Sequence, residues 1–358
     1  MNDQNVEQHE KRSPACESWI DSLFVQMFRL MHTFEKDNFD AHRYRTVAPN
    51  SFFADQHAGY LSFLLKNASS FHRTRELMED ETSRELFDQL ILFRLLGHTH
   101  VRLPFNTPEA REYHSITDTW KIEDTSDTSP YGPLSIYAVP LDDMEIRAKC
   151  WGANVAWTFL FNQYYFDRDG EVVAPARGDH VIDAGGCFGD TALGFARVAG
   201  DKGHVYTFDP LEKHCAIMRE SFAMNPMLAP RISIFEIGLS DENHEGSPPP
   251  AAKGLINPGA NIIGGGFSTR TIDSLVAEGV VPRIDFIKMD VEGSELPALV
   301  GGEAALRQWR PKLAISLYHR PEDFFTIPLW LDSLGIGYRF FLDHYSIHHE
   351  ETVLFATV

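Results

Sequence analysis

The sequence predicts an α/β fold in which a helical and mixed N-terminal region precedes a doubly wound, largely parallel sheet. Short apolar runs alternate with helical patterns from residue 180 onward, as parallel strands and their crossover helices require. Three of these runs end at a carboxylate, namely Asp183, Asp209 and Asp290. A glycine-rich turn follows the first of them. These observations place a ligand-binding edge at the carboxyl ends of the strands.

Composition and charge exclude several classes of protein. Of the 358 residues, 43% are hydrophobic and 23% are charged, which excludes general disorder and a fibrous chain. The 32 Lys and Arg against 51 Asp and Glu give a net charge of −19, which repels phosphate backbones and anionic lipid. We therefore expect neither a nucleic-acid nor a membrane partner, and no apolar run reaches the roughly 20 residues that span a bilayer. The polar start of the chain has no signal-peptide core, so the predicted location is cytoplasmic.

The N-terminal region is predicted to begin with helices. Residues 1–15 are polar, and we expect them to form a flexible tail. Apolar residues recur at helical spacing over 18–36, which predicts a helix whose stripe could also contact a second copy of the chain. This helix is the basis for expecting a homo-oligomer through the N-terminal region. A second helix is expected at 56–68.

A third helix and a β-rich stretch follow. The helix is expected to begin at a capping box of Thr82 and Glu85 and to end at Gly97. Residues 101–128 are polar and irregular. The region 16–150 carries no chemical motif, so we assign it to packing, oligomer contacts or a cover over the substrate. Along the chain, β-rich segments are predicted at Leu134–Val139, Glu145–Cys150 and Thr158–Phe166.

The C-terminal region alternates strands with helices, and the domain boundary falls near 150–175. Five strands are predicted, at 180–182, 205–208, 232–237, 285–289 and 313–318. The helices between them are predicted at 191–199, 211–224 and 298–308. Two last apolar runs, 338–343 and 352–358, predict a terminal β-hairpin.

The strongest chemical motif is the turn Asp183-Ala-Gly-Gly-Cys-Phe-Gly-Asp190-Thr191 between a strand and a helix. Glycines there allow a tight turn and the close approach of a ligand. Asp209 ends the next strand, where its carboxylate can accept hydrogen bonds from two ribose hydroxyls. Together these features predict a cofactor that contains a nucleoside.

The glycine spacing favours S-adenosylmethionine over a dinucleotide. The fingerprint of NAD-binding proteins is G-x-G-x-x-G, whereas this turn has Gly185, Gly186 and Gly189. Asp190 also places a carboxylate at the start of the helix, where it would oppose a pyrophosphate. The amino-acid part of S-adenosylmethionine tolerates carboxylates beside its ammonium group.

The chain resembles the FkbM-type methyltransferases, a family of class I S-adenosylmethionine-dependent enzymes. The resemblance covers about 175–358 and rests on residues 183–191, 208–210, 238–241, 271–275 and 287–295. It identifies 151–358 as an FkbM-like methyltransferase domain. It implies a Rossmann-like sheet of seven strands with an antiparallel last strand, S-adenosylmethionine as the cofactor, and O-methylation of a sugar, glycan or natural-product hydroxyl.

The resemblance also implies which residues bind the cofactor. Asp209 would hold the ribose hydroxyls, although many relatives have Glu there, and Leu211 would lie against the adenine. The first loop would contribute Asp183, Gly185, Gly186, Phe188, Gly189, Asp190 and Thr191. The adenine edge would be lined by Ile237, Gly238, Leu239 and Ser240.

The predicted catalytic residues are Asp290, Glu292 and His319. Methyl transfer from a sulfonium is an in-line displacement, so the enzyme must mainly align the acceptor hydroxyl and accept its proton. Asp290 or Glu292 could position that hydroxyl; alternatively, Glu292 caps the next helix and Asp290 only holds backbone amides or the cofactor. His319 is a natural general base because its reference pKa is about 6.5. Lys288 is the second candidate for the base.

No metal site is predicted. The histidines at 344, 348 and 349 cluster in the sequence but match no strong ligand template. The four cysteines are widely spaced and form no C-x-x-C pattern. The segment Ser240 to Thr269 is rich in Gly, Pro and Asn, which makes it a candidate lid over the acceptor or a plain surface loop.

Two rival functions remain open at the level of the sequence. A catalytically inactive nucleoside-binding or scaffold protein on the same fold would bind the cofactor without turnover. An NAD-dependent oxidoreductase is disfavoured by the glycine spacing and by Asp190. The expected acceptor is a small molecule or carbohydrate with a hydroxyl, and no segment encodes its identity.

Overall fold

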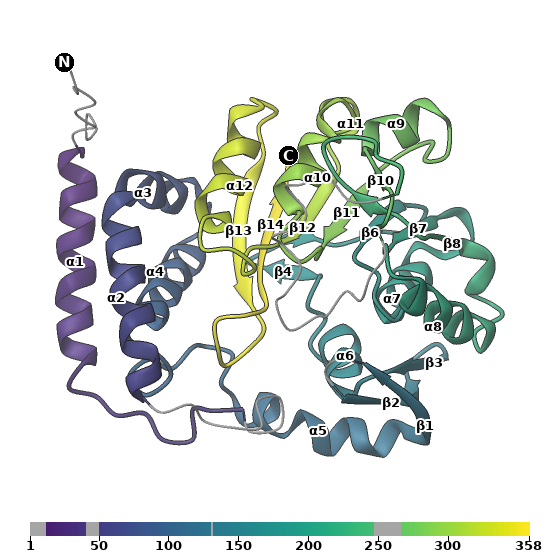
Figure 1. The fold of residues 1–358 in the computed structure, drawn as a ribbon, viewed down its shortest axis with the longest axis horizontal. Helices are drawn as coiled ribbons and strands as arrows, with labels where there is room; N and C mark the ends of the chain where they lie inside the picture. Colours follow the sequence, from purple (N-terminus) through teal and green to yellow (C-terminus); the bar gives the residue numbers. More distant parts are fainter. Residues whose placement is uncertain (1–11, 41–49, 130–131, 247–265) are drawn as a thin grey trace.

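The computed structural model describes residues 12–40, 50–129, 132–246 and 266–358 (Figure 1). Its central element is a seven-stranded sheet. The strands, in spatial order, are β13 (Arg339–His344), β14 (Thr352–Thr357), β12 (Lys312–Ser316), β11 (Phe286–Met289), β6 (His180–Ala184), β7 (His204–Phe208) and β8 (Ile232–Phe235). β14 is antiparallel to β12 and β13, and the other neighbouring pairs are parallel. This arrangement confirms the predicted fold class and the terminal hairpin.

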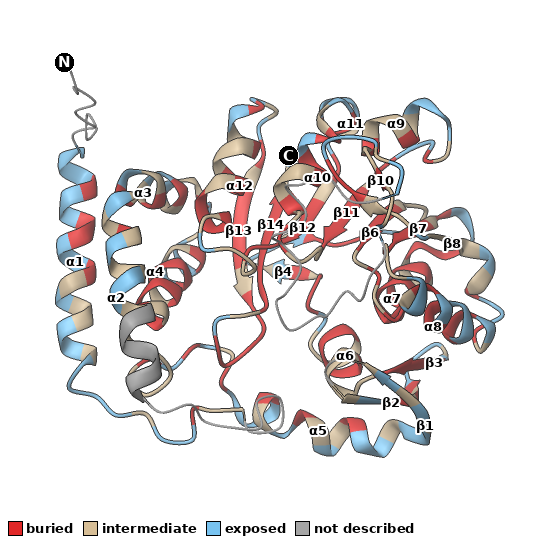
Figure 2. Ribbon diagram, viewed as in Figure 1, coloured by how far each residue is buried: buried red, intermediate tan, exposed pale blue. Residues whose placement is uncertain are grey.

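Side chains alternate along these strands, so the sheet has an apolar core on each face. Ile287 and Met289 of β11 lie in one core, and Phe286 lies in the other. Most residues of the sheet are buried (Figure 2). The surrounding helices are α7 (Asp190–Ala199), α8 (Glu212–Ala223), α9 (Ile272–Ala277), α10 (Glu295–Val300), α11 (Glu303–Trp309) and α12 (Asp323–Ser333). α7 and α8 pack on the face of Phe286, and α9 to α12 pack on the face of Ile287.

The N-terminal region packs against both faces of the sheet. The N-terminal helices are α1 (Pro14–Leu30), α2 (Asn50–Lys66), α3 (Ala68–Leu77) and α4 (Glu81–Leu96). α4 packs against β13, α1 is the outermost helix, and a three-stranded sheet lies near α8 (Figure 1). That sheet comprises β1 (Lys121–Ser129), β2 (Gly132–Pro140) and β3 (Glu145–Cys150). The remaining elements are α5 (Pro108–Trp120), α6 (Gly152–Val155), the π-helix Ala156–Leu160, β4 (Phe166–Arg168) and β5 (Glu171–Val173). The buried residues of α1, α3 and α4 belong to the same apolar core as α12.

The boundaries of three predicted helices were wrong. α2 begins at Asn50 rather than at residue 56 and ends at Lys66 rather than at residue 68. α1 begins at Pro14 because the Ser13 side chain accepts a hydrogen bond from the amide of Cys16, and the helix ends at Leu30 rather than at residue 36. It therefore starts within the segment expected to be a tail, of which residues 1–11 lie outside the described residues. In α4 the N-cap is Asp80, not Thr82. The predicted end at Gly97 is confirmed.

The segment predicted to be irregular contains α5 and β1. The helical signal was weak because only Ala110, Tyr113 and Thr117 of α5 are buried. β1 is an edge strand of mostly exposed polar residues, so it shows no apolar alternation. The β-rich prediction for Thr158–Phe166 was also wrong. The π-helix includes the first residues of this segment, and strand β4 begins only at its last residue, Phe166.

The predicted helix at 298–308 is two helices. Gly301 and Gly302 separate α10 from α11, and a Cβ on Gly301 would lie 2.0 Å from the carbonyl oxygen of Ser240. Helix α12 was not predicted, and it contains Pro328 in its interior. Both differences from the prediction involve Gly or Pro, which disfavour helices in sequence patterns, at positions where tertiary packing determines the backbone conformation.

One apolar face of the chain is exposed. Val25, Phe28 and Met31 on and beside α1 are 49–60% exposed, and Phe34 is 70% exposed. The predicted contact with a second copy through this region stays a prediction. Within the described residues, no helix is both long enough and apolar enough to cross a bilayer.

Candidate cofactor and acceptor site

The glycine turn lies between β6 and α7, against the end of β11. Gly185 and Gly189 have φ angles of 78° and 85°, which favour glycine. A Cβ on Gly185 would lie 1.8 Å from the carbonyl oxygen of Asp290, and one on Gly186 would lie 2.0 Å from the Thr207 hydroxyl. These glycines are therefore required by the packing of the turn as well as by any ligand.

Asp183 supports the turn from beneath. Its carboxylate is fully buried and accepts hydrogen bonds from the hydroxyls of Thr191 and Thr207, each at 3.0 Å. The ammonium of Lys288 lies 3.3 Å from the same carboxylate. Asp183 thus holds α7, β7 and β11 together at the turn.

The ammonium of Lys288 makes three contacts with acceptor groups, which argues against its role as the base. Its ammonium donates to the carbonyls of Ala184 at 3.0 Å and Gly185 at 2.7 Å, in addition to pairing with Asp183. Burial alone would lower the pKa of Lys288, but Asp183 and Asp290 outweigh it and raise that pKa. The ammonium therefore stays charged and fastens the turn to the sheet.

Two other predicted residues of the turn point into the core. Phe188 is 1% exposed. Asp190 is 2% exposed and accepts a hydrogen bond from the hydroxyl of Thr158 in the π-helix Ala156–Leu160. Burial raises the pKa of Asp190 to about 6. The structure thus connects Asp190 to the π-helix beneath the turn.

Asp209 connects the turn to the start of α8. Its Oδ2 accepts from the amide of Cys187 at 3.0 Å and pairs with Nδ1 of His214 at 3.0 Å. Its Oδ1 accepts from the amide of Leu211 at 2.9 Å. A carboxylate offers roughly four acceptor positions, so about one remains for a ligand unless His214 moves.

The predicted adenine edge lies in the short strand β9 (Gly238–Leu239), which pairs with β10 (Thr269–Arg270). Leu239 and Ser240 are buried, and the carbonyl of Ser240 lies against Gly301 between α10 and α11. Ile237 packs at the margin of the core that holds these helices. Most of the predicted lid, residues 247–265, lies outside the described residues.

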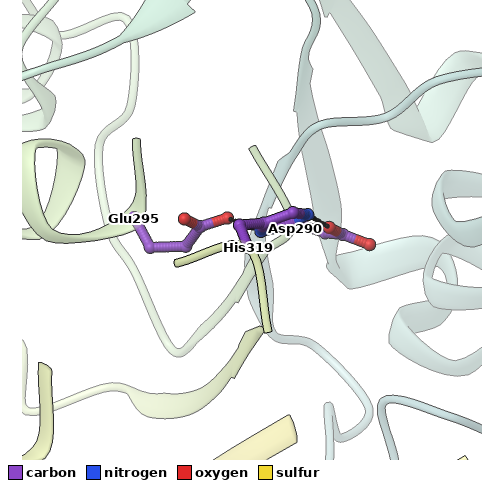
Figure 3. A group of neighbouring side chains, drawn as sticks. All are labelled: Asp290, Glu295 and His319. Carbon is purple, nitrogen blue, oxygen red and sulfur yellow. Dashed lines mark ion pairs between the residues drawn. The ribbon is translucent and has the colours of Figure 1, made fainter. Parts of the chain in front are cut away.

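The predicted catalytic residues lie together at the carboxyl end of β11 and β12, as Figure 3 shows for two of them and Glu295. Nε2 of His319 lies 3.3 Å from Oδ1 of Asp290 and 3.6 Å from Oε2 of Glu292. On the other side of the ring, Nδ1 lies 2.9 Å from Oε1 of Glu295. We call these four residues the acidic rim.

Asp290 is held ionised within the acidic rim. It accepts hydrogen bonds from the hydroxyls of Tyr164 at 2.8 Å and Tyr318 at 3.1 Å. Burial acts to raise the pKa of Asp290, but His319, Lys288 and the two tyrosines outweigh it and lower that pKa. The carboxylate is thus a fixed acceptor.

The carboxylates around His319 favour the doubly protonated, positively charged form of its ring. Burial alone would lower its pKa, but Glu295 first, and then Asp290 and Glu292, raise the pKa of His319 to about 10. A cation cannot accept a proton, which argues against the predicted role of His319 as the general base. The ring instead supplies positive charge between carboxylates.

Glu292 is the group best suited to exchange a proton. Its side chain is 46% exposed, and partial burial together with Asp290 and Glu295 raises its pKa to about 7. Glu292 also has a φ of 54°, a conformation that costs a non-glycine residue roughly 1–2 kcal/mol. Such backbone outliers cluster at functional sites.

Asp290, Glu295 and His319 also form the one group in the described residues whose ligand atoms could hold a metal ion, since these atoms lie within 4.8 Å of one another. The ring, however, stands between the two carboxylates, with a different nitrogen facing each one. A ring with a proton on each nitrogen is a cation at ion-pair distance from both carboxylates, so we interpret the group as an ion-paired triad.

The histidines of the hairpin link form a separate cluster. His344 is buried, with Nδ1 at 2.9 Å from the hydroxyl of Thr352 and Nε2 at 2.8 Å from the carbonyl of His348. Burial lowers the pKa of His344 to about 3. Its two ring nitrogens are thus occupied within the hairpin.

Sequence reasoning missed Glu295, Tyr164 and Tyr318. Glu295 closes the Asp-Val-Glu-Gly-Ser-Glu block, so its position was a usable signal. Tyr164 lies 126 positions before Asp290, in a segment expected to be a strand, and no local pattern connects the two.

Comparisons with known proteins agree with this geometry. Residues 183–340 match the family model described as Methyltransferase FkbM domain. The methyltransferase FkbM from Methylobacillus flagellatus KT is similar in structure, with a TM-score of 0.53 and 19% sequence identity. The match covers 82% of this chain and 60% of that one, so the chain spans about 60% of the length of that relative. No curated protein matched the sequence.

Two further solved structures are less similar. A SAM-dependent methyltransferase from Aquifex aeolicus has a TM-score of 0.30 and 18% identity, over 52% of this chain and 86% of that one. Fibrillarin from Aeropyrum pernix, solved with natively bound S-adenosyl-L-methionine, has a TM-score of 0.33 and 12% identity, over 66% of this chain and all of that one.

The sheet order, the glycine turn and the family match agree with one another. The suspected family resemblance is confirmed, and with it S-adenosylmethionine as the cofactor of this class of domain. Residues 183–340 thus match the methyltransferase FkbM domain, and the seven-stranded sheet that contains them has the fold of the class I methyltransferases.

Proposed function

We propose that the protein transfers a methyl group from S-adenosylmethionine to a hydroxyl of a sugar, a glycan or a natural-product small molecule. One observation supports this most directly: the turn at Gly185 lies against the backbone of Asp290. The loop expected to bind the cofactor is therefore contiguous with the acidic rim. An acceptor held at the rim would lie beside the cofactor.

The residues of the rim suit the chemistry of an alcohol acceptor. S-adenosylmethionine supplies an electrophilic methyl group, and the acceptor oxygen must lose its proton as it forms the new bond. Asp290, fixed by two tyrosines, can accept a hydrogen bond from a hydroxyl and orient it. Glu292, with a pKa of about 7, can take up the proton. The charged ring of His319 stabilises both carboxylates.

Charge favours a neutral, polyhydroxylated acceptor. Carboxylates accept hydrogen bonds from sugar hydroxyls, whereas they repel phosphates. The net charge of −19 acts in the same direction over the whole chain. A nucleic acid is therefore disfavoured as the acceptor.

Calorimetry with S-adenosylhomocysteine tests the cofactor part of the proposal, with NAD as the competing ligand. We expect micromolar binding of S-adenosylhomocysteine by the wild type. Asp209→Ala should weaken it by at least about tenfold, a loss of about 1.4 kcal/mol of binding free energy, because Asp209 holds the backbone amides of the turn. Asp201→Ala is the control, since that side chain is 80% exposed and pairs only at the surface with Arg231. Thermal melting of both variants checks that they fold.

Transfer of a labelled methyl group to a panel of sugars and polyols then tests the acceptor. Turnover that Asp290→Asn abolishes would support the proposal. Binding of NAD in preference to S-adenosylhomocysteine would contradict it. Tight cofactor binding with transfer only to amines or thiols would overturn the assignment to a hydroxyl.

A further inference from the structure

We propose that Glu295 is a positioning residue of the acidic rim: its carboxylate holds the His319 ring with Nδ1 toward the core and Nε2 toward the acceptor side. The inference rests on the proposed function for its catalytic consequence, but the pairing itself can be tested without turnover.

Glu295 is itself locked in place. It is the first residue of α10 and is fully buried. Its Oε1 accepts a hydrogen bond from the amide of Val291 at 2.8 Å, which fastens the carboxylate to the loop that follows β11. The same oxygen lies 2.9 Å from Nδ1 of His319. The contact with the Val291 amide and the start of α10 therefore fix the Glu295 carboxylate independently of His319.

The burial of Glu295 requires a positive partner. An ionised carboxylate without a counter-charge is strongly disfavoured in the interior of a protein. Its other oxygen, Oε2, has no hydrogen-bond partner within the described residues. The His319 side chain, which is 8% exposed, supplies the positive counter-charge for the Glu295 carboxylate.

Carboxylates from three parts of the fold face His319. Asp290 and Glu292 follow β11, Glu295 begins α10, and Asp323 begins α12. Asp323 is buried and accepts from the amide of Arg320. The charge of Lys288 acts on Asp290, and the centroid of the Tyr318 ring lies 4.2 Å from that of the His319 ring. Among these groups Glu295 makes the shortest contact with the imidazole.

The orientation of the His319 ring determines which groups face the acceptor. With Nδ1 held by Glu295, Nε2 is directed to Asp290 at 3.3 Å and Glu292 at 3.6 Å. One imidazolium thereby orients both carboxylates that the proposed reaction uses. If Glu295 loses its charge, the ring can turn or lose a proton, and Asp290 and Glu292 then repel each other without a cation between them.

The test is nuclear magnetic resonance of the full chain labelled with ¹⁵N-histidine, for the wild type, Glu295→Gln and Glu303→Gln. Glu303 is the matched control, because it begins α11 as Glu295 begins α10 but is 44% exposed. His319→Gln identifies the His319 signals by their loss. We expect His319 to stay doubly protonated from pH 6 to 9 in the wild type and in Glu303→Gln. In Glu295→Gln we expect it to become neutral within that range.

Several outcomes would overturn the inference. A His319 signal that is the same in Glu295→Gln and in the wild type would do so. So would a neutral His319 in the wild type, or selective broadening of its signal by micromolar Mn²⁺, which would make the triad a metal site. Thermal melting and circular dichroism check folding, and Glu295→Asp, which keeps the charge, replaces Glu295→Gln if that variant does not fold; its shorter side chain should leave His319 protonated.

Kinetics and binding separate this inference from the proposed function. In Glu295→Gln we expect kcat to fall roughly 10- to 100-fold, the range seen when the supporting partner of a functional histidine is removed. The affinity for S-adenosylhomocysteine should stay as in the wild type, since the glycine turn is untouched. If the wild type binds no S-adenosylhomocysteine, the proposed function fails, whereas the titration of His319 still tests Glu295. An unchanged kcat in Glu295→Gln would contradict the positioning role.

Discussion

Lys288 shows how a buried charge can be structural within a functional site. Its side chain is 2% exposed, and its ammonium meets Asp183 and the carbonyls of Ala184 and Gly185. A buried ion pair is only weak evidence for stability as a whole, but removing one partner leaves the other charge uncompensated. The value of Lys288 therefore lies in holding the turn in one conformation.

Replacing Lys288 by Met should lower the free energy of unfolding by about 3–5 kcal/mol, because Asp183 would stay buried without its cation. Urea denaturation followed by circular dichroism measures the change. Lys202→Met, an exposed lysine, should be nearly neutral. Adding Asp183→Asn should recover part of the loss; a double variant as unstable as the sum of the single ones would show that the two groups do not interact.

Glu292 gives the reaction its expected pH dependence. Its pKa is raised to about 7, so the carboxylate is protonated below that pH and available as a base above it. We expect kcat/KM to rise about tenfold per pH unit below pH 7 and to level off above it. Glu292→Gln should lower the rate by roughly 10²- to 10⁴-fold and remove this dependence. A variant with full activity and the same pH profile would exclude Glu292 as the base.

At the scale of elements, the turn between β6 and α7 joins the cofactor loop to the acidic rim. Its glycines meet backbone and buried side chains, so the turn has no room for a Cβ. The same principle explains the break between α10 and α11, where Gly301 meets the carbonyl of Ser240. In both places close backbone contact, rather than flexibility, requires glycine.

Two glycines with similar φ angles allow the cost of a Cβ clash to be measured apart from the cost of backbone strain. Gly185 has a φ of 78° and would place a Cβ 1.8 Å from the Asp290 carbonyl, whereas Gly279 has a φ of 73° and nothing within 4 Å. Gly185→Ala should abolish binding of S-adenosylhomocysteine or folding. Gly279→Ala should cost only about 1–2 kcal/mol, the strain of a left-handed residue. Equal melting temperatures for the two variants would contradict the close contact.

At the scale of the whole molecule, the N-terminal region and the methyltransferase domain are joined through both apolar cores and through the sheet edge at β13. The Ser83 hydroxyl of α4 accepts a hydrogen bond from the amide of Leu342 in β13, and the amide of Glu79 donates to the carbonyl of Phe340. Tyr164, between the π-helix and β4, donates a hydrogen bond to Asp290 itself. The segment that precedes β6 therefore contributes to the acidic rim as well as to packing.

The hairpin at this edge should make stability sensitive to acid. His344 is neutral in the folded chain because burial lowers its pKa to about 3, whereas its unfolded value is about 6.5. A lowered histidine pKa means that the unfolded chain takes up the proton first, so this contribution is complete above about pH 6.5 and is lost as the pH falls below it. The stability difference between wild type and His344→Gln should therefore shrink by about 1.4 kcal/mol per pH unit below 6.5. Thermal melting from pH 7.5 to 5 measures it, and a difference independent of pH would contradict the assignment.

Local patterns were sufficient to predict the parallel strands, the glycine turn and the acids at the strand ends. Alternation, turn chemistry and strand endings are properties of neighbouring residues, and parallel strands place their carboxyl ends at one edge. The same reasoning failed for β1, whose exposed polar residues carry no alternation, and for α12, whose Pro328 hides a helix. The protonation state of His319, the engagement of Lys288 and the contribution of Tyr164 required the folded chain. Each depends on contacts between residues far apart in sequence, such as the 104 positions between Lys288 and Ala184, and on burial that strengthens charges only after the chain has packed.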